Sequence, residues 1–190
     1  MSDLFHKSVP IAFVDAVFDT MERGNWHTYQ VLTKRSSLMM RYLRRRYGDQ
    51  RAPRHIWVGV SIEDAKNAVR LHHLQCAQAT TKFVSFEPLL GSVGTVDLRG
   101  VDWAIVGGES GPDARPMAEE WAIEIRDLCR SAGVAFFFKQ WGGVRKSANG
   151  RRLEGCTYDE MPYRVVHEVP SRQERLARIA ETEKALTGAT

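Results

Sequence analysis

The sequence predicts an α/β fold, with a parallel sheet of about five strands built as a partial (β/α) barrel or as an open sheet. Short apolar runs rich in β-branched and aromatic residues recur along the chain, and such runs are typical of strands buried on both faces. Helical patterns separate most of these runs, and that alternation favours right-handed crossovers between parallel strands. A length of 190 residues allows one good hydrophobic core.

The first half of the chain is expected to supply two strands and three helices. Val9–Glu22 has apolar residues at helical spacing and precedes the first strand, His27–Leu32 (HTYQVL). Ser36–Tyr47 shows the same spacing and predicts the next helix. The second strand is His55–Val60 (HIWVGV), and a helix over Ile62–Gln78 is expected to follow it.

The second half supplies the remaining strands. Lys82–Phe86 (KFVSF) and Val101–Val106 (VDWAIV) are the third and fourth strands. The link between them, Glu87–Gly100, contains three glycines and a proline, so at most one turn of helix is expected there. A helix over Met117–Ala132 then leads to the fifth strand, Val134–Phe138 (VAFFF). Five parallel strands do not close an eight-stranded barrel, so both sheet edges are expected to stay open.

Two regions are distinguished along the chain. Residues 1–143 are expected to form the β/α domain, and residues 144–190 a polar loop and a C-terminal helix that packs on it or extends from it. The stretch Gly142–Arg152 is polar and glycine-rich, which is typical of a mobile loop. Ser171–Leu186 reads as a helix, because Ser171 is followed three residues later by Glu174, the pattern of a capping box.

Composition limits the class of protein. The sequence contains neither an apolar run of transmembrane length nor a start like a secretory signal, so we expect a cytoplasmic protein with no membrane partner. The three cysteines, Cys76, Cys129 and Cys156, are far apart, as in a protein with reduced thiols. His72 and Cys76 are one helical turn apart, but no further ligand has useful spacing, so no metal site is expected.

Positive charge is concentrated in one segment. The net charge is +4, yet residues 34–54 hold eight basic residues against the single Asp49. One interpretation is a solvated helix end, where arginines also suit the negative pole of the helix dipole. The other is a nucleic-acid-binding surface, because lysine and arginine neutralise phosphates. The candidates for that surface are Arg41, Arg44, Arg45, Arg46, Arg51 and Arg54.

Charged or polar residues follow every predicted strand, and the carboxyl ends of parallel strands meet at one edge of a sheet. We therefore expect a binding site for a small molecule there. A polar residue must also follow any strand that ends at the surface, so the pattern alone leaves a structural explanation open. The candidate pocket residues are Lys34, Arg35, Ser61, Glu63, Glu87, Glu109, Arg115, Lys139 and Gln140.

Two details strengthen the site hypothesis. Glu87 lies between Phe86 and Pro88, and a charge among apolar neighbours must be paired, hydrated or neutralised. Lys139 follows three phenylalanines in the same way, so a pair between Lys139 and Glu87 would satisfy both. The loop Gly107–Gly111 (GGESG) has two interpretations, an anion-binding loop or a tight turn. Glu87 and Glu109 acting as acid and base in a metal-free hydrolase is a further alternative.

Six sequence blocks carry a resemblance to a known family. In order they resemble the phage gp-thirty-seven/gp-sixty-eight family, a domain of unknown function in bacterial and phage proteins, and they span roughly residues 1–143. The blocks are SDLFH (Ser2–His6), QVLTKR (Gln30–Arg35), VGVSIED (Val58–Asp64), FVSFEPLLG (Phe83–Gly91), WAIVGGESGPDARPM (Trp103–Met117) and FFFKQWG (Phe136–Gly142).

The resemblance implies a radical-SAM-like protein with a partial (β/α) barrel. In full-length relatives it implies an iron–sulfur cluster, held by a three-cysteine loop that precedes the SDLFH block, together with S-adenosylmethionine. This chain opens on that block, so we expect it to be truncated, to hold no cofactor alone and to be catalytically incomplete. Its matched positions are the candidate pocket residues named above. At the open edge of the first strand we expect self-association or the docking of a missing N-terminal segment.

Overall fold

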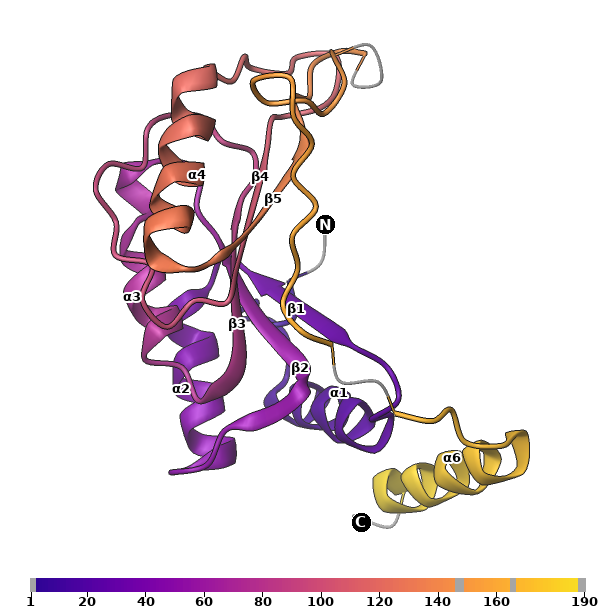
Figure 1. The fold of residues 1–190 in the computed structure, drawn as a ribbon. Helices are drawn as coiled ribbons and strands as arrows, with labels where there is room; N and C mark the ends of the chain where they lie inside the picture. Colours follow the sequence, from indigo (N-terminus) through magenta and orange to yellow (C-terminus); the bar gives the residue numbers. More distant parts are fainter. Residues whose placement is uncertain (1–2, 146–148, 165–166, 188–190) are drawn as a thin grey trace.

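The computed structural model describes residues 3–145, 149–164 and 167–187 and shows a mixed α/β fold. One parallel sheet is formed by β1 (Tyr29–Thr33), β2 (Ala52–Ser61), β3 (Ala79–Phe86), β4 (Trp103–Gly107) and β5 (Ala135–Gln140). The strands lie in the order in which they occur along the chain, and the sheet is not closed (Figure 1). The expected open parallel sheet of five strands is confirmed.

The helices are α1 (Ile11–Arg23), α2 (Ser36–Tyr47), α3 (Val69–Gln75), α4 (Glu119–Ala132) and α6 (Arg172–Thr187). Because the strand order never reverses, right-handed crossovers place the connecting helices on the same face of the sheet. Helices α2, α3 and α4 accordingly cover one face (Figure 1). The sheet is therefore singly wound.

The predicted helix Ile62–Gln78 is much shorter in the structure. A single turn of 3-10 helix, Ala65–Asn67, precedes α3. The start of the predicted helix is held in extended backbone instead, since Ile62 N donates to Ser85 O over 2.9 Å and Leu90 N donates to Glu63 O over 2.8 Å. Pairing with the neighbouring strand end therefore overrides helical spacing at this point.

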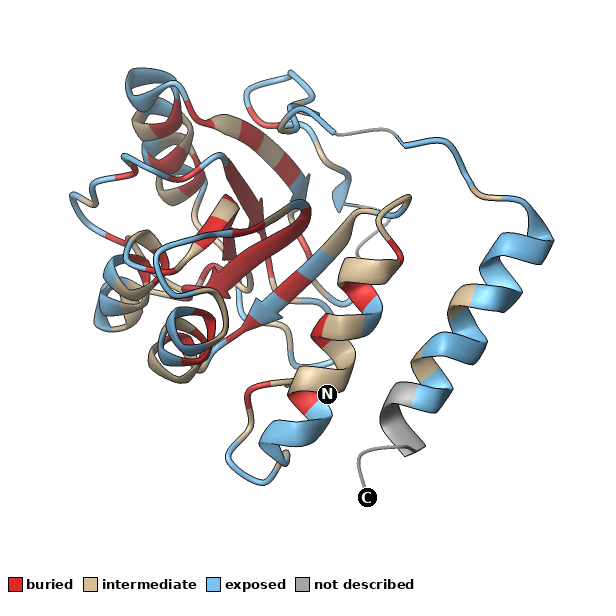
Figure 2. Ribbon diagram, turned by 90° about the horizontal axis from the view of Figure 1, so that it is seen from below, coloured by how far each residue is buried: buried red, intermediate tan, exposed pale blue. Residues whose placement is uncertain are grey.

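Side chains on the two faces of the sheet form separate cores. On the helix-covered face, Ile56, Val58 and Val60 of β2 are fully buried. Figure 2 shows the central strands of the sheet buried along most of their length. On the opposite face, Trp57, Phe83, Trp103 and Ile105 form a second buried cluster, with Phe137 packed against it. Gly59 makes room for this cluster, because a Cβ there would lie 2.4 Å from Phe83 Cζ.

The chain beyond β5 returns along that strand. Asp159 forms an antiparallel bridge with Phe137, and Phe138 N donates to Tyr158 O over 3.0 Å. Trp103 Nε1 donates to Glu160 O over 2.8 Å, which fixes the segment to the second cluster. The expectation of two open sheet edges is therefore wrong for β5. At the other edge β1 pairs only with β2 in the sheet, and association at that edge stays a prediction.

Residues 146–148 of the predicted mobile loop lie outside the described residues. The expected C-terminal helix is present as α6, and Glu174 N and Ser171 N complete the capping box with the Ser171 and Glu174 side chains. Among the helices that the structure describes, none combines the length and apolar content needed to cross a bilayer.

Candidate ligand site at the carboxyl ends of the strands

The nine residues predicted to form the pocket are called here the rim. They lie at or beyond the carboxyl ends of parallel strands, and these ends all lie along the same edge of the sheet (Figure 1). They make three ion-pair groups at the strand ends, one of them with Asp3, and a fourth in the loop after β4. The rim residues are Lys34, Arg35, Ser61, Glu63, Glu87, Glu109, Arg115, Lys139 and Gln140.

Glu87 is held by one cation and one hydroxyl group. Its Oε1 lies 3.0 Å from Lys139 Nζ, and Ser85 Oγ donates to its Oε2 over 3.1 Å. The Glu87 side chain is 19% exposed, whereas that of Lys139 is 53% exposed. The expected pair between Glu87 and Lys139 is confirmed, and the ammonium is its solvent-facing member.

The backbone after β3 fixes the position of Glu87. Leu89 N donates to Gly107 O over 3.0 Å, and the Leu89 side chain is fully buried. The neighbouring Leu90 N donates to Glu63 O. The turn is thus tied to the ends of β4 and of β2, so Glu87 is held between them.

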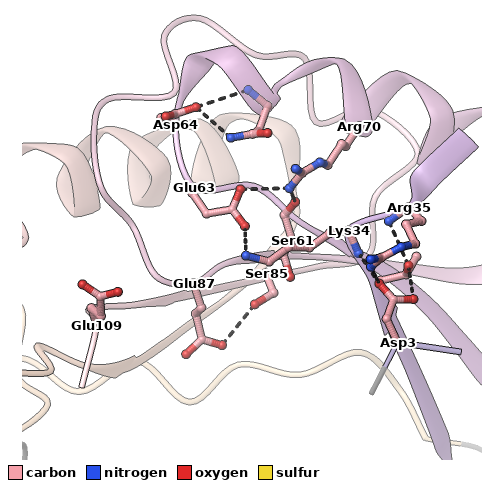
Figure 3. Close-up of polar contacts among 12 residues, drawn as sticks. Asp3, Lys34, Arg35, Ser61, Glu63, Asp64, Arg70, Ser85, Glu87 and Glu109 are labelled. Carbon is pink, nitrogen blue, oxygen red and sulfur yellow. Dashed lines mark hydrogen bonds and ion pairs between the residues drawn. The ribbon is translucent and has the colours of Figure 1, made fainter. Parts of the chain in front are cut away.

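Glu63 is held between two cations. Lys34 Nζ lies 2.5 Å from its Oε1, and an Arg70 guanidinium nitrogen lies 2.8 Å from its Oε2 (Figure 3). The same nitrogen of Arg70 donates to Ser61 O over 2.8 Å. The Glu63 side chain is only 9% exposed, and Lys34 is 43% exposed. Arg70 was not predicted, because its helix gives no sequence signal for a contact seven residues back.

Asp3 was also missed, although it lies in the first resemblance block; Ser2 of that block lies outside the described residues. Asp3 accepts hydrogen bonds from Thr33 Oγ1 and an Arg35 guanidinium nitrogen, each over 2.7 Å, and from Lys34 N (Figure 3). Burial alone would raise the pKa of Asp3. The hydrogen bonds, of which that from Thr33 has the largest effect, lower the pKa by more than burial raises it, so the pKa lies below its usual value. Asp3 thus fastens the N-terminal segment to the end of β1.

Glu109 has its own cation. Two guanidinium nitrogens of Arg115 donate to its two carboxylate oxygens over 2.8 and 2.7 Å. These bonds, with a further one from Arg115 N, lower the pKa of Glu109 to about 2. Glu109 lies apart from Glu87 (Figure 3). Since each carboxylate is bound to a different cation, the geometry gives no support to a shared acid–base role for the two.

The glycine-rich loop Gly107–Gly111 serves close packing. Gly108 N donates to Gln140 O over 3.0 Å, and Gly143 N donates to Glu109 O over 2.6 Å. A Cβ on Gly108 would lie 1.9 Å from Trp141 O. Of the two sequence interpretations, the structure shows the tight turn, because Gly108 N is already bound to the end of β5 and Gly111 N donates to Gly143 O in the loop after β5.

The basic segment divides into paired and unpaired arginines. Arg46 pairs with Asp19 at 2.5 Å and Glu22 at 3.0 Å, and Arg45 pairs with Asp15 at 3.0 Å. All three carboxylates belong to α1, so these arginines join α2 to α1. The other candidates are exposed and form no salt bridge with any residue that the structure describes; they are Arg41, Arg44, Arg51 and Arg54.

The cysteines do not form a ligand set for an iron–sulfur cluster. Cys76 is exposed after α3, Cys156 is exposed beyond β5, and Cys129 is buried in α4. Burial raises the pKa of Cys129 to about 12, which disfavours the thiolate that a metal needs. Within residues 3–145, 149–164 and 167–187, no three histidine, cysteine or carboxylate side chains are grouped to hold a metal ion. These residues do not fit a cluster.

None of the rim residues lines any of three cavities found in the described part of the chain. The rim is therefore a surface on which every charged residue forms an ion pair, within the rim or with Asp3 or Arg70. A ligand that binds there has to replace at least one of these pairs.

Comparison with known proteins identifies a family. A family model described as "Protein of unknown function (DUF5131)" matches residues 1–162. No curated protein and no solved structure matches the chain. The matched region contains the whole rim and the segment that pairs with β5, whereas α6 lies beyond it.

Proposed function

We propose that this chain, which belongs to the DUF5131 family of proteins of unknown function, binds a small zwitterionic ligand at the rim. The observation that carries the proposal is the pair between Glu87 and Lys139, a largely covered carboxylate with its cation turned to solvent. In singly wound parallel sheets the carboxyl ends of the strands are the usual place for ligands. The proposed activity is binding of that ligand by paired charges.

A zwitterion fits the rim because it can exchange into an existing ion pair. The ligand carboxylate would accept from Lys139, and the ligand ammonium would donate to Glu87. Every charge then keeps a partner in both states, which avoids the cost of an unpaired, partly buried charge. A simple anion would instead lie beside the Glu87 carboxylate, and like charges at contact are unfavourable.

The second ion-pair group extends the same surface. Lys34, just beyond β1, is 43% exposed above the covered Glu63, which follows β2, the neighbour of β3. It is a second accessible ammonium at the strand ends. A longer ligand can use it for a further polar group while its zwitterionic end occupies the first pair. Arg70 keeps Glu63 neutralised if Lys34 turns toward the ligand.

The resemblance to phage-related radical-SAM-like proteins supports a specific ligand. S-adenosylmethionine carries an amino-acid end with the required carboxylate and ammonium. Glu87 and Lys139 lie in two of the blocks that carry the resemblance, FVSFEPLLG and FFFKQWG. Because the cysteines do not fit a cluster, the role proposed for this chain alone is binding, and no radical step is assigned to it.

Calorimetric titration of the full chain with S-adenosylmethionine tests this function. We expect binding that Glu87→Gln and Lys139→Met each weaken at least tenfold. Methionine should compete and adenosine should not, because adenosine lacks the zwitterion. Arg99→Gln is the matched control, since Arg99 forms an exposed ion pair with Asp97 away from the rim, and it should leave the affinity unchanged. Equal affinity in all three variants would refute a rim site.

A second candidate function is nucleic-acid binding, favoured by the four exposed arginines that form no salt bridge with described residues. Arg44, Arg51 and Arg54 lie near the amino-terminal end of β2, at the opposite end of that strand from the rim. Fluorescence anisotropy of a labelled DNA duplex should show binding. The logarithm of the association constant should fall linearly with the logarithm of the salt concentration, with a slope of about 0.9 for each phosphate contacted. Arg44→Gln with Arg51→Gln should reduce that slope. An absence of binding at low salt would dismiss this candidate.

A further inference from the structure

A cavity of about 610 Å³ lies between α6 and the C-terminal end of α1. Helix α6 lies beside α1 in both views (Figures 1 and 2). Residues from the end of α1 to the first residue of β1 form one wall, and α6 forms the other. The cavity is thus at the amino-terminal end of β1, whereas the rim is at the carboxyl ends of the strands. Its volume is in the range of cavities that hold small molecules.

Polar contacts hold α6 against this wall. An Arg23 guanidinium nitrogen donates to Thr182 Oγ1 over 2.7 Å, and an Arg178 guanidinium nitrogen donates to Arg23 O over 3.1 Å. The Arg178 guanidinium carbon lies 5.2 Å from the centre of the Trp26 ring, a cation–π distance. Leu176 and Ile179, which also line the cavity, stay about half exposed at 55% and 53%. The contacts that dock α6 therefore leave the apolar part of the cavity unfilled.

The floor of the cavity is aromatic. The rings of Trp26 and His27 lie 5.5 Å apart, and those of His27 and Tyr29 lie 6.0 Å apart. The indole nitrogen of Trp26 is buried and has no hydrogen-bond partner among the described residues. A buried donor without a partner is costly, so an acceptor on a bound molecule would relieve it. The floor thus offers the faces and edges of three tilted aromatic rings, and the indole N–H of one of them has no partner among the described residues.

The charge around the cavity is mostly positive. Four arginines line it, Arg23, Arg172, Arg175 and Arg178, against the single carboxylate of Glu183. Arg23 and Arg178 are used in docking α6. Arg172 and Arg175 form no salt bridge with any residue in the described part of the chain, and both are exposed. Proteins often bind phosphate through bidentate hydrogen bonds from arginine guanidinium groups, and these two arginines are available for that.

We propose that this cavity binds a nucleotide, with its base against Trp26 and its phosphate on Arg172 and Arg175. A ring system with an acceptor, joined to an anion, matches the aromatic floor, the unused indole donor and the positive wall together. Aromatic side chains with arginines are also how proteins hold single nucleotides of a strand. The ligand chemistry is therefore the nucleotide unit, either free or as part of a single strand.

Calorimetric titration of the full chain with 5′-AMP and 5′-UMP tests the proposal, with adenosine and inorganic phosphate as partial probes. We expect the nucleotides to bind and each partial probe to bind at least tenfold more weakly. Arg172→Gln with Arg175→Gln should weaken nucleotide binding at least tenfold. The control is Arg99→Gln, which removes an exposed ion pair with Asp97 outside the lining of the cavity and should bind as the parent does.

Trp26→Leu should also weaken binding, and thermal unfolding of that variant checks that the chain still folds. A titration with an eight-nucleotide single strand distinguishes a free nucleotide from a nucleotide unit of a strand as the ligand. Binding of the strand alone, lost in the double arginine variant, supports the site with a nucleic acid as its occupant. The proposal is overturned if neither probe binds, or if binding is unchanged in both the arginine and the tryptophan variants. The rim variants Glu87→Gln and Lys139→Met should not affect this binding, so the two sites are tested separately.

Discussion

Lys139 of β5 and Glu87, just beyond β3, meet at 3.0 Å across the end of β4, the strand that lies between them. Gly107 ends β4 at this point, and a Cβ there would lie 2.6 Å from Glu87 Oε1. The missing side chain of one strand thus leaves room for an ion pair between its two neighbours.

Two adjacent glycines of β4 and its loop should therefore respond differently to alanine. In Gly108→Ala the new Cβ meets the backbone oxygen of Trp141, which has no room to move, so we expect a loss of about 2 kcal/mol or more in the free energy of unfolding. In Gly107→Ala it meets the flexible end of Glu87, so the loss should stay below about 1 kcal/mol. Urea unfolding measures both. Equal losses of stability in the two variants would contradict the difference between the contacts at Gly107 and Gly108.

The Asp3 carboxylate should make stability depend on pH. Its pKa in the folded chain is below the value of 3.8 expected for an unfolded chain. Its contribution is then complete above about pH 4 to 5 and is lost as pH falls through the folded pKa. Asp3→Asn should lower stability by about 1 kcal/mol at pH 7 and by progressively less below pH 4.

Urea unfolding of the parent and of Asp3→Asn between pH 7 and pH 2.5 measures this difference. Glu109, whose pKa is about 2, titrates in the same range, but it is present in both proteins and its effect cancels. A difference that stays constant down to pH 2.5 would show that the Asp3 charge contributes nothing.

The ion pairs between α1 and α2 should matter for stability even if α2 binds nucleic acid. Arg46 is 15% exposed and contacts carboxylates of α1, so Arg46→Met should cost about 1–2 kcal/mol in the free energy of unfolding. Arg44→Met, on the same helix without a salt bridge to described residues, should change stability by less than about 0.5 kcal/mol. Thermal and urea unfolding compare them. Similar small effects in both variants would mean that the Arg46 pairs are hydrated and weak.

The segment after β5 should be needed for a stable fold. A chain ending at residue 143 lacks the backbone partners of β5 and the acceptor of the Trp103 indole, Glu160 O. We expect it to aggregate or to unfold at much lower urea concentration than a chain ending at residue 164. Size-exclusion chromatography and urea unfolding of the two chains check this. Equal stability would show that β5 does not depend on its returning partner.

The fold was predictable because strand and helix signals alternate. Buried runs such as Val58–Val60 and Phe83–Phe86 mark their own strands, and polar residues such as Glu63 and Glu87 mark where strands end. A charge between apolar neighbours must find a partner, and for that reason the Glu87–Lys139 pair was foreseeable. The relation between sheet order and helix placement then follows from crossover handedness.

Other features depend on tertiary contacts that leave no local signal. Arg70 and Asp3 reach the rim from a helix and from the N-terminal segment, and nothing in their neighbouring residues announces it. The shortening of the predicted helix after β2 follows from backbone pairing with Ser85 and Leu90. The arginines of α2 were recognised as a charged group, but their carboxylate partners on α1 could be identified only once the two helices were seen to pack.

The most direct measurement is a nitrogen–proton NMR titration of the labelled full chain with S-adenosylmethionine. We predict saturable shifts at the backbone amides around Ser61–Glu63, Ser85–Glu87 and Gly107–Glu109, with Lys139 and Gln140 of β5, and little change near Trp26. Shifts confined to residues around Trp26 and α6, or no shifts at millimolar ligand, would contradict the rim as the binding site.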